Sequence, residues 1–346
     1  MSVIKDPQTE TSRVAVVRRA IGSQLRVFAV AATAILLATT LCTHAARSFW
    51  VADLLANLRT QQVLGLLACL VFHVAFRSWK LLAVSVVGLL VHLPVFVSDY
   101  VYCQAASGAA HSGLDHTAQA TLSLTTANVL TTNRRYADIA NELLTLNSDL
   151  VAVIEISSGL HDHLSGDFSR VYPYSVFYVQ DSGNFGIALY SKLPWSNAAL
   201  TAFNDDSLKS VVATINHGGH RWHIIATHTL PPIGRRNYEH RNQHLKLLSD
   251  EVNRLRLGDS SPHVVVMGDL NITPWSPIFQ DFAAEANLRR DTVSFGLRPT
   301  WFRFPTFAFG LVLDHVLTTG GISCLNYTVS PDVGSDHRFV TVELAP

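Results

Sequence analysis

Three long apolar segments occupy most of the first hundred residues, at about 25–46, 61–78 and 80–98. A helix of about 20 apolar residues crosses the ~30 Å hydrocarbon core of a bilayer. One signal peptide followed by buried core helices is a poor alternative, because three such segments are present and no clear small-residue cleavage site follows the first. We therefore expect residues 1–103 to form a membrane region with three transmembrane helices that contact the lipid bilayer.

The distribution of positive charge predicts how these helices are oriented. Four arginines between residues 13 and 26 precede or begin the first segment, and Arg77 and Lys80 lie between the second and third. Lys and Arg residues in short loops beside transmembrane helices favour the cytoplasmic side of the membrane. The N-terminus and the turn between the second and third segments are therefore expected on the cytoplasmic side of an inner (plasma) membrane, and the domain that follows the third segment is expected to be periplasmic or extracellular.

The overall charge balance hides an asymmetry between the two parts of the chain. Residues 1–104 contain nine Lys and Arg and four Asp and Glu, whereas residues 105–346 contain 17 basic and 22 acidic residues. Proteins that bind nucleic acid without reading its sequence normally present a basic surface. The acidic C-terminal part therefore disfavours nucleic acid as a partner, although it does not exclude it.

Residues 104–117 are rich in Ala, Gly, Ser and His without an apolar period, and we interpret them as a linker. From residue 118 to 346, short β-rich runs alternate with helical patterns, which predicts an α/β layered sandwich. Helices are expected at Tyr136–Leu146, Arg236–Leu257 and Pro277–Leu288. Strands are expected at Thr121–Leu130, Leu150–Ile156, Ser175–Val179, Gly186–Tyr190, Val211–Asn216, Trp222–His228, His263–Met267, Leu311–Thr318, Ser323–Val329 and Arg338–Leu344.

Several of the expected strands end on, or run into, a polar side chain. These side chains are Asn128, Glu155, His228, Asp269, Asn271 and Asp314, and the pair Asp336-His337 precedes the last strand. Functional sites in α/β folds are commonly built at strand ends and adjoining loops. Buried carboxylates are rarely left unpaired, so several of them at one edge indicate a cation or a network that shares protons.

This ordered set of motifs resembles the endonuclease/exonuclease/phosphatase (deoxyribonuclease-like) superfamily over about residues 120–346. The resemblance implies a four-layer α/β sandwich with two central β-sheets. The chain departs from the family pattern at Phe339, where proline is frequent, and at Ile154, where glutamine is frequent. Three spans ahead of this domain are also similar to bacterial membrane proteins linked to glycopeptide (teicoplanin) resistance.

The resemblance implies a divalent-metal site for phosphoester hydrolysis. Glu155, with Asn128 and Asp336 nearby, would hold the ion. Carboxylate and amide oxygens suit Mg²⁺, and Mn²⁺ is a possible substitute. Zinc is the competing interpretation of the many histidines. However, no HxH or HExxH pair is placed as zinc hydrolases require, and the one HxH run, His161-Asp-His163, lies in a polar loop.

The resemblance also implies catalytic roles for five residues. Asp269 would orient or deprotonate the attacking water, and Asn271 would hold that water or a phosphate oxygen. His337, oriented by Asp314, would act as a charged hydrogen-bond donor or as an acid/base group. His228 would donate to the phosphoryl oxygens as negative charge develops on them.

These residues predict a metal-dependent phosphoric ester hydrolase, expected to act on a phosphorylated lipid or envelope metabolite outside the membrane. One alternative is an extracytoplasmic endonuclease or exonuclease, and another is a catalytically inactive module that binds phospholipid. Two further groups of residues each have two possible roles. The basic group Arg235, Arg236, His240 and Arg241 is either a solvated helix face or an anion contact. The aromatic group Trp301, Phe302, Phe304, Phe307 and Phe309 is either a lipid-facing lip or a packed core.

Overall fold

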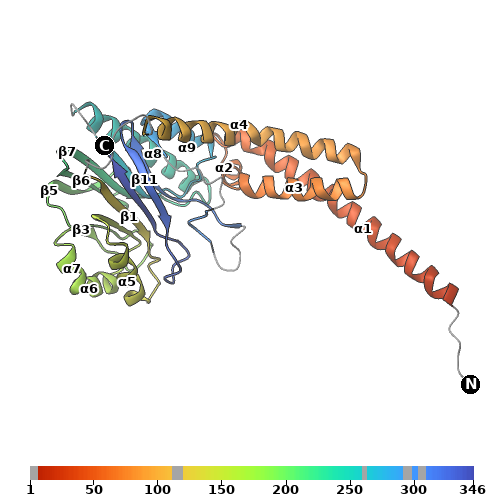
Figure 1. The fold of residues 1–346 in the computed structure, drawn as a ribbon, viewed down its shortest axis with the longest axis horizontal. Coiled ribbons are helices and arrows are strands. Elements are labelled where there is room, and N and C mark those ends of the chain that lie inside the picture. The colour runs from red at the N-terminus through yellow and green to blue at the C-terminus, as the bar shows by residue number, and fades with distance from the viewer. Residues whose placement is uncertain (1–6, 111–119, 259–262, 291–297, 303–308) are drawn as a thin grey trace, which may run out of the picture.

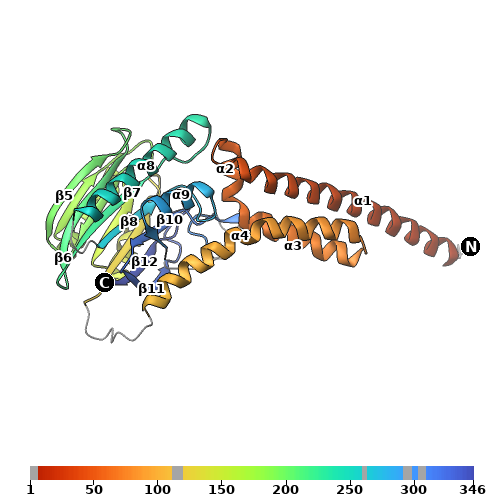
Figure 2. The same ribbon diagram turned by 90° about the horizontal axis from the view of Figure 1, so that it is seen from above.

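The computed structural model describes residues 7–110, 120–258, 263–290, 298–302 and 309–346. The N-terminal part is helical, with the elements α1 (Pro7–Cys42), η1 (Thr43–Ala45), α2 (Trp50–Asn57), α3 (Arg59–Ala75) and α4 (Trp79–Ala110). Figures 1 and 2 show α1, α3 and α4 side by side, projecting from one side of a layered domain. The N-terminal end of α1 and the α3–α4 turn both lie away from that domain.

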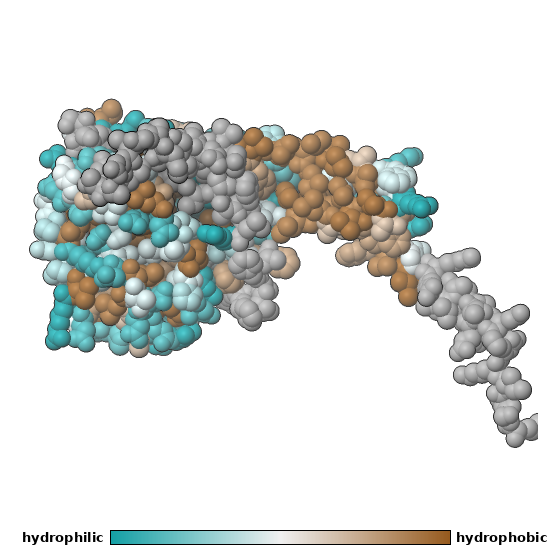
Figure 3. All heavy atoms as spheres, viewed as in Figure 1, coloured by the Kyte–Doolittle hydropathy of each residue, from teal (hydrophilic) through white to brown (hydrophobic). Residues whose placement is uncertain are grey.

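Two helical segments are long and apolar enough to cross a membrane, Ala20–Ala45 and Trp79–Ser98, with mean hydropathies of 2.0 and 2.3. A third crossing is available if α2 and α3, which are bent by 64° against each other, count as one broken span. The 17 residues of α3 measure about 25 Å at 1.5 Å per residue, which is slightly short for a full crossing. Apolar side chains cover the surface of the projecting helices (Figure 3).

The expected linker is in part a continuation of α4, the last helix of the N-terminal part. Helix α4 runs on to Ala110, so residues 104–110 are helical, and residues 111–117 lie outside the described part of the chain. Four alanines in residues 104–110 favour helix over loop. The side chain of Phe96 on α4 contacts Trp275 of the domain, with ring centroids 5.7 Å apart. The domain is therefore packed directly against the membrane region.

Two buried histidines join the helices of the membrane region. His73 Nε2 lies 2.9 Å from Thr33 Oγ1, and His92 Nε2 lies 3.0 Å from Thr40 Oγ1. Both contacts link α1 to a later helix. These histidines therefore contribute to helix packing.

The C-terminal domain contains two six-stranded mixed sheets in the part of the chain that the structure describes. The first has the order β11-β12-β1-β2-β4-β3. Its strands are β1 (Leu122–Asn128), β2 (Leu150–Ile154), β3 (Tyr174–Tyr178), β4 (Ile187–Ser191), β11 (Ser323–Val329) and β12 (Val340–Ala345). The second has the order β5-β6-β7-β8-β10-β9. Its strands are β5 (Trp195–Ala202), β6 (Lys209–His217), β7 (His220–His228), β8 (His263–Asp269), β9 (Leu288–Arg289) and β10 (Asp314–Thr319).

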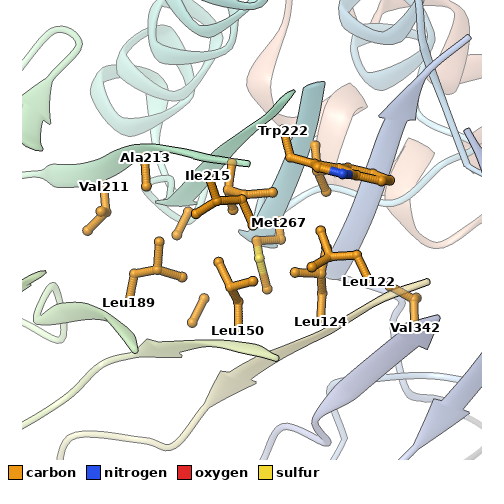
Figure 4. Packing of buried hydrophobic residues seen from close by; sticks show 14 of the residues in the cluster. Leu122, Leu124, Leu150, Leu189, Val211, Ala213, Ile215, Trp222, Met267 and Val342 are labelled. Atoms are coloured by element: carbon orange, nitrogen blue, oxygen red, sulfur yellow. The ribbon is translucent and has the colours of Figure 1, made fainter. Parts of the chain in front are cut away.

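Apolar side chains from the two sheets interdigitate to form the central core. Leu124 and Leu150 of the first sheet face residues such as Ile215 and Met267 of the second (Figure 4). Alternate strand residues point to opposite faces, so the outer faces need their own cover. The first sheet is covered by α5 (Tyr136–Leu146), α6 (Ser158–Leu164) and α7 (Asp167–Val171), and the second by α8 (Arg235–Leu257) and α9 (Pro277–Glu285). The predicted four-layer α/β sandwich is confirmed.

Parallel pairing within each sheet places the polar strand ends at one edge. Strands β1 and β2 are parallel, with Asn128 opposite Ile154, so Glu155 follows directly. Strands β7 and β8 are parallel as well, with His228 opposite Asp269. Strand β10 is antiparallel to β8 and begins opposite Asp269. Because both sheets present these ends on the same side, their polar residues converge.

The short helix α2 is anchored to the domain by a buried ion pair. Asp53 Oδ2 lies 2.6 Å from Arg241 Nη2, and both side chains are 0% exposed. Ser276 Oγ donates to the other oxygen of Asp53 at 3.0 Å. Each carboxylate oxygen of Asp53 thus has a partner in the domain, as a buried charge requires.

The next turn of α2 makes a second set of buried contacts. Asn57 Oδ1 accepts hydrogen bonds from the backbone N–H of Thr273 at 2.6 Å and from its hydroxyl at 3.0 Å. Trp275 Nε1 donates to the Asn57 carbonyl at 3.2 Å. Asp53 and Asn57 are four residues apart and therefore share one face of α2. That face is bonded to the loop that follows β8.

Candidate active site

Glu155 and Asp269 bring one carboxylate from each sheet to the converging edge. Asn128 lies between them, and its Nδ2 donates to Glu155 Oε1 at 3.0 Å and to Asp269 Oδ2 at 3.1 Å. Its Oδ1 accepts from the backbone N–H of Leu130 at 3.2 Å. Asn128 therefore joins the two carboxylates through its amide N–H₂ group, whereas a metal ligand would have to offer its amide oxygen.

The backbone is shaped to bring both carboxylates into the site. Glu155 has a φ of 64°, an uncommon conformation for a residue with a side chain, and such outliers gather at functional sites. Gly268, just before Asp269, has a φ of 142°, and a Cβ added there would lie 1.8 Å from the Thr227 carbonyl oxygen. Glycine at 268 thus permits the close approach of β7 and β8 directly beneath the site.

His337 is held by Asp314 and by the loop that carries it. Its Nδ1 lies 2.8 Å from Asp314 Oδ2, and its backbone N–H donates to Ser335 Oγ at 3.0 Å. His337 Nε2 faces Asp269 Oδ2 at 3.6 Å. The neighbouring His315 points elsewhere, since its Nε2 lies 2.8 Å from the Ile272 carbonyl and its ring packs on Phe279.

His228 and Asn271 complete the polar floor. His228 Nε2 lies 3.6 Å from Asp269 Oδ2 and 3.3 Å from Asn271 Nδ2. Asn271, in a left-handed conformation with a φ of 48°, also donates from its backbone N–H to Asp269 Oδ1 at 2.8 Å. Asp336 lines the same cavity and accepts a hydrogen bond from Trp301 Nε1 at 3.2 Å.

Burial and neighbouring charges raise the pKa values of some groups in the site and lower the pKa of another. Burial raises the pKa of the Glu155 carboxyl and the pKa of the Asp269 carboxyl. Burial alone would lower the pKa of His337, but Asp314 and Asp269 beside it raise that pKa to about 10. Burial, together with the charge of His337, lowers the pKa of His228 to about 3. The site therefore contains one cationic and one neutral imidazole at neutral pH.

The carboxylates fit a divalent cation. Ligand atoms of Glu155, Asp269 and His337 all lie within 4.8 Å of one another, and this is the group among the described residues that could hold a metal ion. Two buried carboxylates with raised pKa values are stabilised by a cation, and their oxygens are the ligands that Mg²⁺ and Mn²⁺ prefer. Asp336, expected from sequence to be a ligand, lines the same cavity but lies outside this group, whereas Asp269 belongs to it.

A cavity of about 590 Å³ opens above these side chains. None of the described residues that line it is Lys or Arg. Leu54, Asn57 and Leu58 of the membrane region line it together with the catalytic candidates. Sequence reasoning missed these three residues, because nothing in their local pattern relates them to strand ends far along the chain.

The structure also answers part of what the sequence left open. In the basic group, Arg241 forms a buried ion pair with Asp53. Arg235 forms an ion pair with Glu239 on the surface. In the aromatic group, Trp301 lines the cavity, and Phe302 stacks on Arg338 at 4.7 Å. Phe309 is 69% exposed, and Phe304 and Phe307 lie outside the described residues.

A layered sandwich of two mixed sheets, with carboxylates, amides and imidazoles gathered at one edge, defines an α/β protein with a candidate metal centre. The model of the Endonuclease/Exonuclease/phosphatase family matches residues 125–337, and the chain therefore belongs to that family. Members of this family are phosphoester hydrolases that depend on divalent metal ions. No curated protein sequence matches the chain.

Solved structures share the fold at low sequence identity. A humanized TDP2 from D. rerio has a TM-score of 0.54 at 14% identity, with 65% of this chain and 99% of that one covered. Sphingomyelinase C from Streptomyces griseocarneus has a TM-score of 0.50 at 18% identity, with coverages of 65% and 99%. A beta toxin variant from Staphylococcus aureus with bound magnesium ions has a TM-score of 0.50 at 21% identity, with coverages of 64% and 99%. These likenesses show the fold alone.

Proposed function

We propose that this protein is a Mg²⁺-dependent phosphoesterase that hydrolyses a phosphorylated lipid or envelope metabolite at the outer side of the membrane. The observation that carries the proposal is the position of the group Glu155, Asp269 and His337. It lines a cavity that Leu54 and Leu58 of the N-terminal helical region line as well. A substrate that reaches these residues therefore lies beside the membrane helices.

Glu155 and Asp336 would hold the metal ion, with Asn128 keeping Glu155 and Asp269 in place. A bound Mg²⁺ would neutralise charge on the phosphoryl and leaving oxygens, and Mn²⁺ would be able to substitute for it. The magnesium ions in the staphylococcal beta toxin, which has the same fold, support this choice of ion.

The remaining residues would activate water and stabilise developing charge. A water oxygen forms a bond to phosphorus, its proton passes to Asp269, and the bond to the leaving oxygen breaks. The raised pKa of Asp269 suits it to accept that proton, because a base works best when its pKa lies near the ambient pH. Asn271 would orient the water.

The two imidazoles would play different parts. His337 is held in its cationic form by Asp314 and would face the phosphoryl oxygens as a charged donor. His228, kept neutral by burial, would donate a hydrogen bond to the same oxygens as their charge grows. Such preorganised donors act without rearranging during the reaction.

The competing proposal of an extracytoplasmic nuclease is less well supported. TDP2 and sphingomyelinase C, by their names and titles, act on DNA and on a lipid, and both share this fold. Phosphate contacts from Lys and Arg dominate affinity for nucleic acid, and none lines the described part of this cavity. A catalytically inactive lipid-binding module is disfavoured because all eight site residues are present.

One substrate screen would test the proposal. Purified full-length protein with Mg²⁺ would be offered phospholipids, prenyl phosphates and DNA, with EDTA and the Glu155→Gln variant as controls. We expect metal-dependent product release from a lipid substrate. Preferential cleavage of DNA would replace the proposal with the nuclease, and lipid binding without turnover would replace it with the inactive module.

A further inference from the structure

The cavity above the catalytic residues has two apolar walls of different origin. One comes from the domain, where Pro231, Pro232 and Ile233 follow the β7 strand that carries His228. The other comes from Leu54 on α2 and Leu58 at its end, and we call these two residues the α2 wall. The α2 wall lies outside the segment that matches the family, residues 125–337.

The spacing of residues along α2 places an anchoring face beside the face that carries Leu54 and Leu58, with Asn57 both bonded to the domain and in contact with the cavity. Asp53 and Asn57, four residues apart, bond to Arg241 and Thr273 of the domain. Leu54 is shifted by one position, so with Leu58 it forms an adjacent face, because residues four apart align on a helix. The anchoring face therefore fixes where the α2 wall lies.

The α2 wall is only partly covered by protein. Leu58 is 36% exposed, and Ile233, which also lines the cavity, is 69% exposed. Exposed apolar surface beside a polar centre favours a ligand that is itself divided into polar and apolar parts. Leu58 also lies at the 64° bend between α2 and α3. A bilayer crossed by these helices would supply hydrocarbon close to it.

We propose that the α2 wall holds the hydrocarbon part of an amphiphilic phosphoester whose phosphate lies against Glu155, Asp269 and His337. This inference rests on the proposed function. It assigns the lipid specificity of the enzyme to Leu54 and Leu58. Contact between methylene groups and the leucines removes apolar surface from water on both sides. Discrimination between long and short esters therefore depends on Leu54 and Leu58.

The test uses two esters with the same leaving group, 4-nitrophenyl methyl phosphate and 4-nitrophenyl hexadecyl phosphate, in the same detergent micelles. Methyl and hexadecyl phosphate, assayed for phosphate release, serve if the enzyme prefers monoesters. The measured quantity is the ratio of kcat/KM for the long ester to that for the short ester. Because both are measured on one sample of full-length protein, the ratio does not depend on the folded fraction.

We expect the wild-type ratio to favour the long ester. Leu54→Gln and Leu58→Gln should each reduce the ratio by about tenfold, mainly through KM, since one altered apolar contact is worth roughly that factor. Leu200→Gln is the matched control, because Leu200 on β5 is 39% exposed against 36% for Leu58 and does not line the cavity. A ratio that neither wall variant changes would overturn the inference while leaving the phosphoesterase in place.

A second measurement keeps the two proposals apart. Hexadecyl phosphate carrying a diazirine near the middle of its chain would be photolysed with full-length protein, and labelled peptides identified by mass spectrometry. Label on the peptide that contains residues 50–59 supports the inference, and its absence there overturns it. Wild-type protein that hydrolyses no ester with Mg²⁺ present contradicts the proposed function, whatever the labelling shows.

Discussion

At the residue scale, the amide of Asn128 shows how two carboxylates can share a small buried space. Glu155 and Asp269 come from different sheets and would repel each other if both were ionised. Asn128 donates one hydrogen bond to each, at 3.0 and 3.1 Å, and a cation would reduce the repulsion further. The sequence pattern identified all three residues, but it could not say which atom of the amide faces the carboxylates, since that depends on the rotation of one side chain.

The first prediction concerns the charge of Glu155. Glu155→Gln keeps the size of the side chain and removes a negative oxygen, so turnover should fall by roughly 10²-fold or more. More Mg²⁺ should be needed for half-maximal activity. Because burial raises the pKa of Glu155, its charged form is costly in the fold, and the melting temperature in EDTA should not fall. Wild-type activity at limiting Mg²⁺ would remove Glu155 from the site.

The second prediction concerns the coupling of Asp314 with His337. Asp314 fixes the ring of His337 and stabilises its cationic form, and a group oriented in this way contributes about 10²–10⁴-fold to the rate. Asp314→Asn and His337→Ala should each lose most activity. The double variant should be little worse than His337→Ala, because residues that act as a unit are not additive. Rates per folded molecule provide the measurement.

His315→Ala is the control for this pair. His315 is adjacent to Asp314 and equally buried, at 2% exposed, but its ring bonds to the Ile272 carbonyl on the opposite side. We expect a loss of thermal stability with the rate per folded molecule retained. An inactive His315→Ala with an active His337→Ala would reverse the assignment of the two histidines.

At the element scale, helix α2 joins the membrane region to the domain through a fully buried ion pair. Burial lowers the pKa of Arg241, and Asp53 beside it opposes that shift. The two residues are 188 positions apart in the sequence. Nothing in the local pattern around either residue predicts the other, since a single sequence gives no information on pairing over such a distance. Arg241 was consequently interpreted as a solvated residue or an anion contact.

The third prediction is the energetic cost of breaking this pair. Asp53→Asn leaves the Arg241 charge buried without a counter-charge and should destabilise the protein by about 3–5 kcal/mol. Asp281→Asn is the matched control, because Asp281 pairs with Arg47 across the same junction with both side chains about half exposed, and exposed pairs contribute little. Thermal unfolding of both variants in one detergent gives the comparison. Equal melting temperatures for the two would contradict a buried anchor.

Regular patterns explain which elements could be predicted. The predicted helix Tyr136–Leu146 and strand Ser323–Val329 match the observed α5 and β11, because both have clear turn residues at their ends. Strand β5 was missed, since its residues WSNAALTA are half-exposed and lack a clear apolar alternation. The linker was placed where α4 is still helical, because weak periodicity in an Ala-rich stretch does not distinguish helix from coil.

At the scale of the whole molecule, the three expected spans and the observed bundle agree in relative arrangement. The N-terminus and the α3–α4 turn lie on one side of the bundle and the domain on the other (Figure 1). An odd number of crossings requires this arrangement. The third crossing, however, depends on the bent pair of α2 and α3. Hydropathy alone could not reveal this pairing, because residues 59–62 at the bend are all polar and the expected second segment begins only at residue 61.

The fourth prediction assigns the sides of the membrane. An alkaline phosphatase reporter fused after Ser112 should be active, and one fused after Trp79 inactive, because Arg77 and Lys80 favour a cytoplasmic turn. Reporter activity normalised to protein level is the measurement. The reverse pattern would place the catalytic residues in the cytoplasm and make nucleotides and DNA the leading substrates.

The buried pair of Asp53 and Arg241 also constrains how such a protein can change over evolutionary time. A catalytic domain transplanted onto an unrelated anchor would carry a guanidinium that is 0% exposed and has no countercharge. An anchor transplanted alone would carry the Asp53 carboxylate without the arginine that neutralises it. Recombination between chains is therefore productive only when it transfers both residues together. The anchor and the hydrolase domain should be inherited as one unit and not exchanged as separate modules.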